Sequence, residues 1–352
     1  MNIRRYIPKF LKYILIITYV LSRCISRGIP SKKITLNLAG VLPNASSDKI
    51  IHGGKVKLLY LREYFGDTWK RFNLAYFVSS GLPFAPVIWI RIYKLFGVKI
   101  VWNQNGVAYP AWAGEKTSLI NSLMKPIREA DYVIYQTEFT KRCADRFLGK
   151  FMGPSTVLIN PVDTKQFSPP SFSLPIEPLT IIMSGHHFES KERLKMSLET
   201  ARELIKRGIE AKLIVIGNTQ ELPKEKWLEE IGKFTQRDAP GLYHRAHILL
   251  HLKNLDPCPT FVLEALACGL PVVGLANGGM PELVDQKSGI LIATPENFEK
   301  FQYPTPDEIV AAIIKIRENL QDFSLNARKQ SLKFDKEIWL KKHAEIFQKL
   351  CQ

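Results

Sequence analysis

Two carboxylates, Asp256 and Glu264, flank a Cys-Pro-Thr sequence that is typical of a helix start. The first turn of a helix has unpaired N–H groups and a positive dipole, so the backbone of Thr260, Phe261 and Val262 could hold a diphosphate without a metal ion. Glu264 could accept hydrogen bonds from ribose hydroxyls, because a carboxylate only accepts. Asp256, in the preceding loop, could face the attached sugar. The alternative is an ordinary crossover whose acids are a helix cap and a surface charge.

The elements that must position these acids form a strand, helix, strand unit. The apolar run 247–252 predicts a strand, and residues 261–268 predict the helix. Gly269 stands where a left-handed helix cap belongs. A second short strand is expected at 271–275, followed by a glycine turn and another helix at 281–284. Asp256 would then lie at the carboxyl end of a strand.

The same stretch resembles the signature of the group 1 (family 4) retaining glycosyltransferases of the GT-B fold. In that signature two Glu are separated by seven residues, and an Ala-x-Ala-x-Gly-x-Pro-Val run and a Gly-Gly-x-Pro-Glu turn follow. This sequence has Asp256 at the first acid and Glu264 at the second, then the run at 265–272 and the turn at 278–282. The resemblance covers most of residues 34–350. It implies an α/β fold in which two Rossmann-like domains face a cleft, with the donor in the second and the acceptor in the first.

The resemblance also implies the reaction. A hexose-type sugar would pass from a nucleotide-diphosphate sugar to a polysaccharide or lipid-linked acceptor, with retention of anomeric configuration. The sequence has no Asp-x-Asp motif, so we expect neither a metal ion nor another cofactor. Family members place an Arg and a Lys near the diphosphate, close to Gly185. The Arg position is His186 here, so Lys191 and Arg193 are the candidate cations; a solvated helix face is the alternative.

On the acceptor side, Asn105-Gly106 follows the predicted strand 98–102, where the family often has His-Gly. Asparagine can orient a hydroxyl but cannot act as a base, so Asn105 joins Asp256 as a candidate catalytic residue in an orienting role. Tyr109 offers an aromatic face for a sugar, or belongs to a packed aromatic loop. Gly53-Gly54, predicted to end a polar turn, matches a family Gly-Gly that approaches the substrate, or is a flexible loop.

Five segments follow from these signals. They are an arm at 1–33, an acceptor-side domain at 34–168, a linker at 169–178, a nucleotide-sugar-binding domain at 179–330, and a C-terminal segment at 331–352. The linker is rich in proline. In the last segment Asp335 should cap a helix with Ile338, Trp339 and Phe347 on one side, and the GT-B resemblance implies that this helix crosses back to the first domain.

The amino-terminal arm is basic as well as apolar. The chain has net charge +16, and residues 1–47 hold eight basic residues and no acid. The apolar run 13–21 is too short to span a bilayer, which takes about 20 residues. It favours an interfacial helix on an anionic membrane surface; a helix packed on the domain is the alternative, and the outline of a signal peptide lacks a clear cleavage site.

Scattered cysteines without Cys-x-x-Cys pairs favour a reduced, cytoplasmic protein that could be peripheral on the inner face of a membrane. Three other functions stay open. The charge could serve a nucleic-acid glycosyltransferase, although it gathers beside an apolar run, so we expect no nucleic acid partner. The others are a GT-B sugar-nucleotide epimerase and a catalytically silent scaffold.

Overall fold

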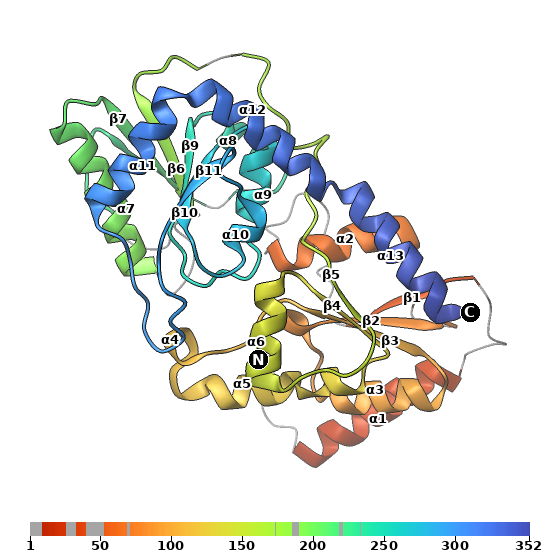
Figure 1. Ribbon diagram of the computed structural model, residues 1–352. Helices are drawn as coiled ribbons and strands as arrows, with labels where there is room; N and C mark the ends of the chain where they lie inside the picture. The colour runs from red at the N-terminus through yellow and green to blue at the C-terminus, as the bar shows by residue number, and fades with distance from the viewer. Residues whose placement is uncertain are drawn as a thin grey trace, which may run out of the picture.

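The computed structural model describes residues 9–25, 33–39, 53–68, 71–172, 174–184, 190–217, 221–232 and 234–352. They form two α/β lobes, each built on a parallel sheet (Figure 1). The first sheet has the order β1-β2-β3-β4-β5 and the second β11-β10-β9-β6-β7-β8. The strands of the first are β1 (Leu36–Ala39), β2 (Leu74–Val78), β3 (Lys99–Gln104), β4 (Tyr132–Tyr135) and β5 (Ser155–Val157). Those of the second are β6 (Leu179–Ser184), β7 (Ala211–Ile216), β8 (Leu228–Ile231), β9 (Ile248–His251), β10 (Val272–Leu275) and β11 (Gly289–Ile292).

Helices connect the strands and cover both faces of each sheet, as parallel strands require. The helices up to β5 are α1 (Lys9–Ile25), α2 (Gly53–Phe65), the 3₁₀ turn η2 (Ser79–Gly81), α3 (Pro86–Leu95), α4 (Pro110–Ala113), α5 (Thr117–Met124) and α6 (Glu138–Leu148). Those after β5 are α7 (Ser190–Lys206), α8 (Ala239–Tyr243), α9 (Thr260–Ala267), α10 (Met280–Leu283), α11 (Pro306–Glu318), α12 (Leu320–Ser331) and α13 (Lys336–Cys351). The architecture is GT-B.

The first domain has a core on each face of its sheet. One core joins α1, α3, α5 and α6 to the sheet, and aromatic side chains such as Trp102 and Tyr93 fill it. The other joins α2 to the sheet and takes Trp339, Leu340 and Phe347 from α13. Helix α13 therefore leaves the second domain and completes the core of the first (Figure 1). Asp335 caps it by accepting from the N–H of Glu337, as expected.

The second domain is built in the same way. Helices α9 and α12 pack together over one face, while α7 and α11 pack together over the other. The strand order reverses between β6 and β9, and in open α/β sheets ligands bind beside such a switch point, outside the carboxyl ends of the strands. The strand β9 is followed by the loop that contains Asp256.

Two local expectations were wrong. Gly53 and Gly54 begin α2 instead of ending a turn. Ile338 is 48% exposed, because the buried face of α13 is formed by Trp339, Leu340, His343 and Phe347. Gly269, in contrast, has φ +79°, the left-handed cap that the sequence predicted.

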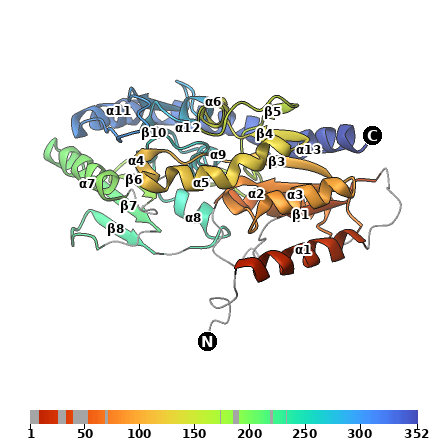
Figure 2. The same ribbon diagram turned by 90° about the horizontal axis from the view of Figure 1, so that it is seen from below.

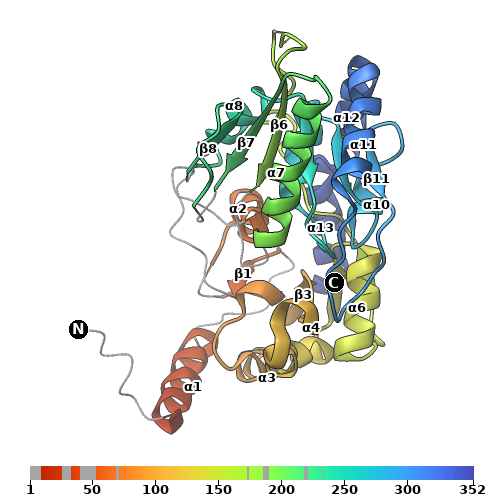
Figure 3. The ribbon, with the colours of Figure 1, turned by 90° about the vertical axis from the view of Figure 1, so that its left-hand side faces the viewer.

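Helix α1 lies against α3 on the side of the first domain that faces away from the second (Figures 2 and 3). Val20 is buried in the first core, and Ile16 packs against it. Within the described residues no helix combines the length and hydropathy that crossing a bilayer takes.

Candidate functional site

The predicted acids and the predicted acceptor-side residues lie at edges of the two sheets that face each other. Asn105 and Gly106 directly follow β3, and Asp256 follows β9, so both loops are at carboxyl ends of parallel strands. A Cβ atom placed on Gly106 would lie 3.4 Å from Cγ of Pro257, so the loops touch across the domain boundary. The fold thus brings the two candidate catalytic loops together.

A cavity of about 410 Å³ opens between these loops. Its wall is mostly apolar, and a few polar groups lie on it, as is usual for sites that bind small organic ligands. The polar residues are Ser79, Ser80, Asn105, Thr140 and Lys253. The remaining lining residues are Gly106, Val107, Ala108, Tyr109, Trp112, Ile120, Met124, Phe139, Cys143, Leu255 and Pro257.

Asp256 is a buried, ionised carboxylate. Its Oδ2 atom lies 3.2 Å from Nζ of Lys253 and 3.3 Å from Nε2 of His251. Burial disfavours the charge, but Lys253 and His251 outweigh it and hold the pKa of Asp256 far below its usual range. Burial also lowers the pKa of His251, so this ring is neutral near pH 7. Lys253 is therefore the cationic partner of Asp256.

The Gly-Gly turn of the signature supports the backbone of Asp256. The N–H of Gly279 donates to the carbonyl oxygen of Asp256 at 2.8 Å. Gly278 has φ +65°, and a Cβ atom there would lie 2.7 Å from the same oxygen. A side chain at Gly278 would displace the loop, so the turn requires glycine both for its conformation and for the close approach.

Glu264 projects from α9 beside the second-domain core. The hydroxyl of Tyr243 donates to its Oε2 atom at 2.8 Å. Burial raises the pKa of Glu264 to about 7, and the hydrogen bond from Tyr243 only partly opposes this. At the start of the same helix Thr260 and Phe261 are half-buried and Val262 is buried. The N–H of Val262 donates to the carbonyl oxygen of Pro259 at 3.2 Å, so this predicted phosphate donor already has a partner. Thr260 and Phe261 are the two predicted positions with exposed surface at the helix start.

The two candidate cations differ in their surroundings. Lys191 is exposed in the first turn of α7, whereas Arg193 is 5% exposed. Arg193 helps to lower the pKa of His251, so its charge lies near the Asp256 cluster. Gly185, like His186, lies outside the described residues. Arg193 is thus the cation that the structure brings to this edge of the sheet.

On the acceptor side, the amide of Asn105 is held at both ends. Its Oδ1 atom accepts from Nζ of Lys57 at 2.9 Å, and its Nδ2 atom donates to Oγ of Ser80 at 2.7 Å. Tyr109 is 7% exposed and packs edge-on against Trp112, so it lines the cavity with its ring partly covered. Gly53 and Gly54 form the first turn of α2, the helix that contacts α9 across the boundary.

A comparison with known proteins identifies the second domain. Residues 178–319 match the family model described as Glycosyl transferases group 1. They form a group 1 glycosyltransferase domain. The match contains both acids, the glycine turn and Arg193, so the residues that surround the α9 N-terminus belong to this glycosyltransferase domain.

Curated relatives match about half of the chain at low identity. The chain is 25% identical over 213 residues to a probable sucrose-phosphate synthase of Thermosipho melanesiensis, covering 56% of this chain and 46% of that protein. It is 26% identical over 187 residues to WcaL of Escherichia coli, described as a putative colanic acid biosynthesis glycosyltransferase, covering 46% of each. The chain therefore spans about half the length of the curated relatives it matches.

Solved structures share the fold of most of the chain. Anabaena Alr3699/HepE, solved in complex with UDP, superposes with a TM-score of 0.60 at 16% identity, covering 78% of each chain. Sucrose-phosphate synthase from Thermosynechococcus elongatus gives 0.60 at 14% identity, covering 96% of this chain and 92% of the other. At these identities the likeness concerns the GT-B fold alone.

Residues that sequence reasoning missed connect the glycosyltransferase domain to the first domain. The carboxylate of Glu282 accepts from the N–H groups of Glu138 and Phe139 at 2.7 and 2.9 Å, so it caps α6 of the other domain. Oγ1 of Thr137 donates to the carbonyl of Pro257 at 2.9 Å. Glu282 belongs to the Gly-Gly-x-Pro-Glu turn, so the signature itself could have suggested it. Lys57 had no such signal, because it stands among apolar residues in a segment that predicts only an ordinary helix at 55–64.

Proposed function

We propose that this chain is a retaining glycosyltransferase that moves a hexose-type sugar from a nucleotide-diphosphate sugar to a glycan or lipid-linked acceptor. One observation carries the proposal. In a group 1 glycosyltransferase domain, the loop of the ionised Asp256 leads into α9 and Glu264, and it touches the Asn105–Gly106 loop of the first domain. The complex of the GT-B protein Alr3699/HepE with UDP supports a nucleotide donor.

The donor would extend along the start of α9. Glu264 accepts hydrogen bonds from the ribose hydroxyls, and its ionised form accepts them more strongly than the protonated form. The first N–H groups of α9, at Thr260 and Phe261, hold the diphosphate together with the helix dipole. Arg193, buried near His251, adds a full charge, and the exposed Lys191 of the same helix is the second candidate cation. These groups can stabilise the leaving diphosphate without a metal ion.

The reaction proposed is a front-side substitution. The bond between the anomeric carbon and the phosphate oxygen breaks while the acceptor oxygen bonds to that carbon from the same face. The acceptor proton passes to the leaving phosphate oxygen, so no protein base is needed. Asp256 holds the donor sugar through its hydroxyls, and Asn105 donates to an oxygen of the reacting pair. Both side chains orient groups and stabilise charge.

The cavity beside Asn105 indicates the kind of acceptor. Asn105 is hydrogen-bonded to both Ser79 and Ser80, so these three polar residues form one cluster on the wall. Most of the remaining wall is apolar and includes Trp112 and Phe139. This distribution fits an acceptor with two different parts. Its reactive hydroxyl would meet the polar residues, and its apolar part or sugar face would meet the aromatic wall. A lipid-linked sugar has both parts.

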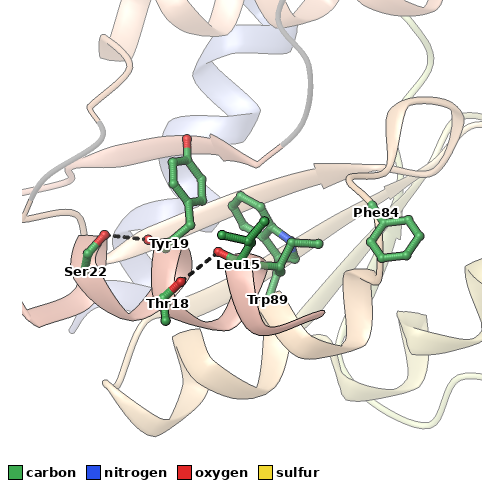
Figure 4. A pocket seen from close by; sticks show the side chains of 7 residues that line it. Leu15, Thr18, Tyr19, Ser22, Phe84 and Trp89 are labelled. Carbon is green, nitrogen blue, oxygen red and sulfur yellow. Dashed lines mark hydrogen bonds between the residues drawn. The ribbon is translucent and has the colours of Figure 1, made fainter. Parts of the chain in front are cut away.

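Helix α1 supports contact with a membrane surface. With Phe84 and Trp89 it lines an open apolar groove, where the hydroxyls of Thr18 and Ser22 donate to carbonyls of α1 itself (Figure 4). The exposed surface of α1 thus has hydroxyls that are hydrogen-bonded within the helix, and it carries the exposed apolar side chains Leu11, Tyr13, Ile14, Leu15, Ile17 and Tyr19. Lys12 and its basic neighbours in sequence favour anionic lipid head groups. We place the enzyme on the inner, cytoplasmic face of such a membrane.

A thermal-shift panel of UDP, GDP and their hexose derivatives tests the donor site. A ligand present at 100 times its Kd should stabilise the protein by about 2.7 kcal/mol, and differential stabilisation identifies the donor. No stabilisation by any nucleotide at millimolar concentration would favour the silent-scaffold alternative and end the proposal.

Transfer by the stabilising donor is then followed by NMR in the presence of EDTA. The expected product has the donor's anomeric configuration and forms at the same rate with and without EDTA. An inverted product or a rate that EDTA abolishes contradicts the mechanism. Conversion of the donor sugar without any acceptor would indicate the epimerase.

Vesicle sedimentation tests the membrane proposal. The chain should bind vesicles that contain anionic phosphatidylglycerol and bind neutral phosphatidylcholine vesicles more weakly. An Ile14→Gln, Leu15→Gln variant should lose most of this binding, whereas Leu325→Gln, an equally exposed leucine on α12, should not. Equal binding by all three proteins would refute α1 as the contact.

A further inference from the structure

Lys57 is a buried lysine on the first-domain side of the cleft. It belongs to α2 and is 2% exposed. Its Nζ atom donates to the side-chain oxygens of Asn103 at 2.5 Å, Asn105 at 2.9 Å and Asn160 at 3.3 Å. The amide of Gln136, when its oxygen faces the lysine, adds an acceptor at 2.6 Å. Within the described residues, the hydrogen-bond acceptors of this ammonium are neutral amides.

A cation surrounded by amides has lost its water without gaining a counter-charge. Burial accordingly lowers the pKa of Lys57 to about 7, and the nearby Cys258 opposes this only weakly. An ordinary core would place an apolar side chain here at less cost. An ammonium has three N–H donors, so the four amide oxygens within reach share them. Removal of the lysine would leave these oxygens facing one another with no donor between them.

One branch of this network has a fixed direction. The Oδ1 atom of Asn103 faces Lys57, which leaves its N–H₂ group for the hydroxyl of Tyr76. That hydroxyl donates to Nε2 of His343, since Nδ1 of this ring must donate to the carbonyl of Trp339. Burial lowers the pKa of His343 to about 3, consistent with a neutral ring. A chain of hydrogen bonds thus runs from Lys57 through Asn103 and Tyr76 to His343 of α13.

The other branch reaches the cavity. Lys57 binds Oδ1 of Asn105, so the N–H₂ group of Asn105 points the other way, to Ser80 on the cavity wall. Lys57 also binds Asn160, whose Nδ2 atom donates to the carbonyl of Cys258, next to the start of α9. The lysine therefore links the acceptor-side amide to the loop that follows Asp256.

We propose that Lys57 is a positioning residue, whose ammonium fixes the side-chain amide of Asn105 with its N–H₂ group directed to Ser80 and the interdomain cavity. Without the lysine, the remaining partners do not fix which end of the amide faces which way, because the Ser80 hydroxyl can donate or accept and the Gln136 amide, 3.0 Å from Oδ1 of Asn105, can present its oxygen or its N–H₂ group. An oxygen could then face the cavity instead of a donor. The effect of Lys57 on turnover rests on the proposed glycosyl transfer. The orientation of the amide does not.

The first test is a crystal structure of a Lys57→Met variant beside the wild type. Methionine has similar length and fills the space without donating. The expected result is an Asn105 amide that is turned or disordered, so that its N–H₂ group no longer donates to Ser80 in one fixed orientation. An Asn105 side chain in its wild-type orientation would overturn the proposal. This readout needs no substrate, so it holds even if no donor is found and the proposed function fails.

A double-mutant cycle with the donor and acceptor from the screen tests the consequence. Asn105→Ala should lower kcat by about 100-fold or more, as loss of an oriented donor does. Lys57→Met should lower kcat by about 10- to 100-fold with the Kd for UDP changed less than about threefold. The double variant should be no slower than Asn105→Ala. Additive losses would mean that Lys57 acts independently of Asn105.

Two further variants separate positioning from folding. Lys57→Gln keeps a neutral N–H donor for Asn105, so it should retain kcat within about threefold of the wild type. It also takes the place of Lys57→Met if the methionine variant does not fold. A glutamine variant with wild-type thermal stability but the turnover of Asn105→Ala would refute the proposal. Lys341→Met, an exposed lysine of α13, controls for loss of a lysine and should behave as the wild type.

Discussion

Replacing Glu264 by glutamine should stabilise the protein while it weakens nucleotide binding. The folded chain raises the pKa of this carboxyl from 4.5 to about 7, so the folded state holds a proton that the unfolded state releases. The contribution of this carboxyl to stability is therefore complete below about pH 4.5 and is lost as the pH rises through about 7. Glutamine has no charge to bury, and its oxygen can still accept from Tyr243.

The full pKa difference corresponds to about 3 kcal/mol at pH 8. The side chain is partly exposed, which screens its charge, so we expect Glu264→Gln to gain about 1 to 2 kcal/mol at pH 8 and nothing at pH 4.5. Affinity for UDP should fall about tenfold at pH 8, because the ribose hydroxyls lose a charged acceptor. Wild-type affinity should itself rise from pH 6 to pH 8.

Denaturant unfolding at pH 4.5 and pH 8 measures the first effect, and UDP titration calorimetry measures the second. Glu318→Gln, an exposed acid on α11, is the matched control and should change neither. If the difference in free energy of unfolding between Glu264→Gln and the wild type is the same at both pH values, the assigned protonation is wrong. Unchanged UDP affinity at pH 8 would remove Glu264 from the donor site.

Three other substitutions test the loops around the cleft. Asp256→Asn should lower kcat more than about 100-fold and leave UDP affinity within about threefold, measured by transfer kinetics and calorimetry; retained turnover would contradict the sugar contact. Gly278→Ala should cost about 1 to 3 kcal/mol in denaturant unfolding and reduce turnover, because its φ of +65° and the close Asp256 carbonyl exclude a Cβ atom. Glu282→Gln should cost about 1 kcal/mol by weakening the cap of α6, and a thermal unfolding profile identical to wild type would contradict it.

Sequence patterns predicted the parts of this structure that depend on local chemistry. The helix cap at Gly269, the cap at Asp335 and the strand that ends before Asp256 follow from residue types at short spacing. The short edge strands β5 and β8 escaped prediction, because three or four half-exposed residues give little periodicity. Ile338 was wrongly assigned to the buried face of α13, because helical spacing alone does not decide between two neighbouring faces before the packing partner of the helix is known.

The residues that join the two domains could not be predicted. Lys57 meets Asn160 although 103 positions separate them, and Glu282 meets the N-terminus of α6 from 144 positions away. Such pairs exist only once the cleft has formed. A lysine in a helical pattern is also assigned to solvent by default, so the amide cluster that surrounds Lys57 had no trace in its own segment.

The route of α13 has a consequence for synthesis on the ribosome. Because Trp339, Leu340 and Phe347 fill a first-domain core, the domain made first cannot close that core until the last helix has been translated. The glycosyltransferase domain can fold earlier, while apolar side chains such as Leu61 stay exposed to solvent on the nascent first domain. Cells should therefore need chaperone protection for the amino-terminal half in particular, and premature termination before α13 should yield an aggregation-prone product.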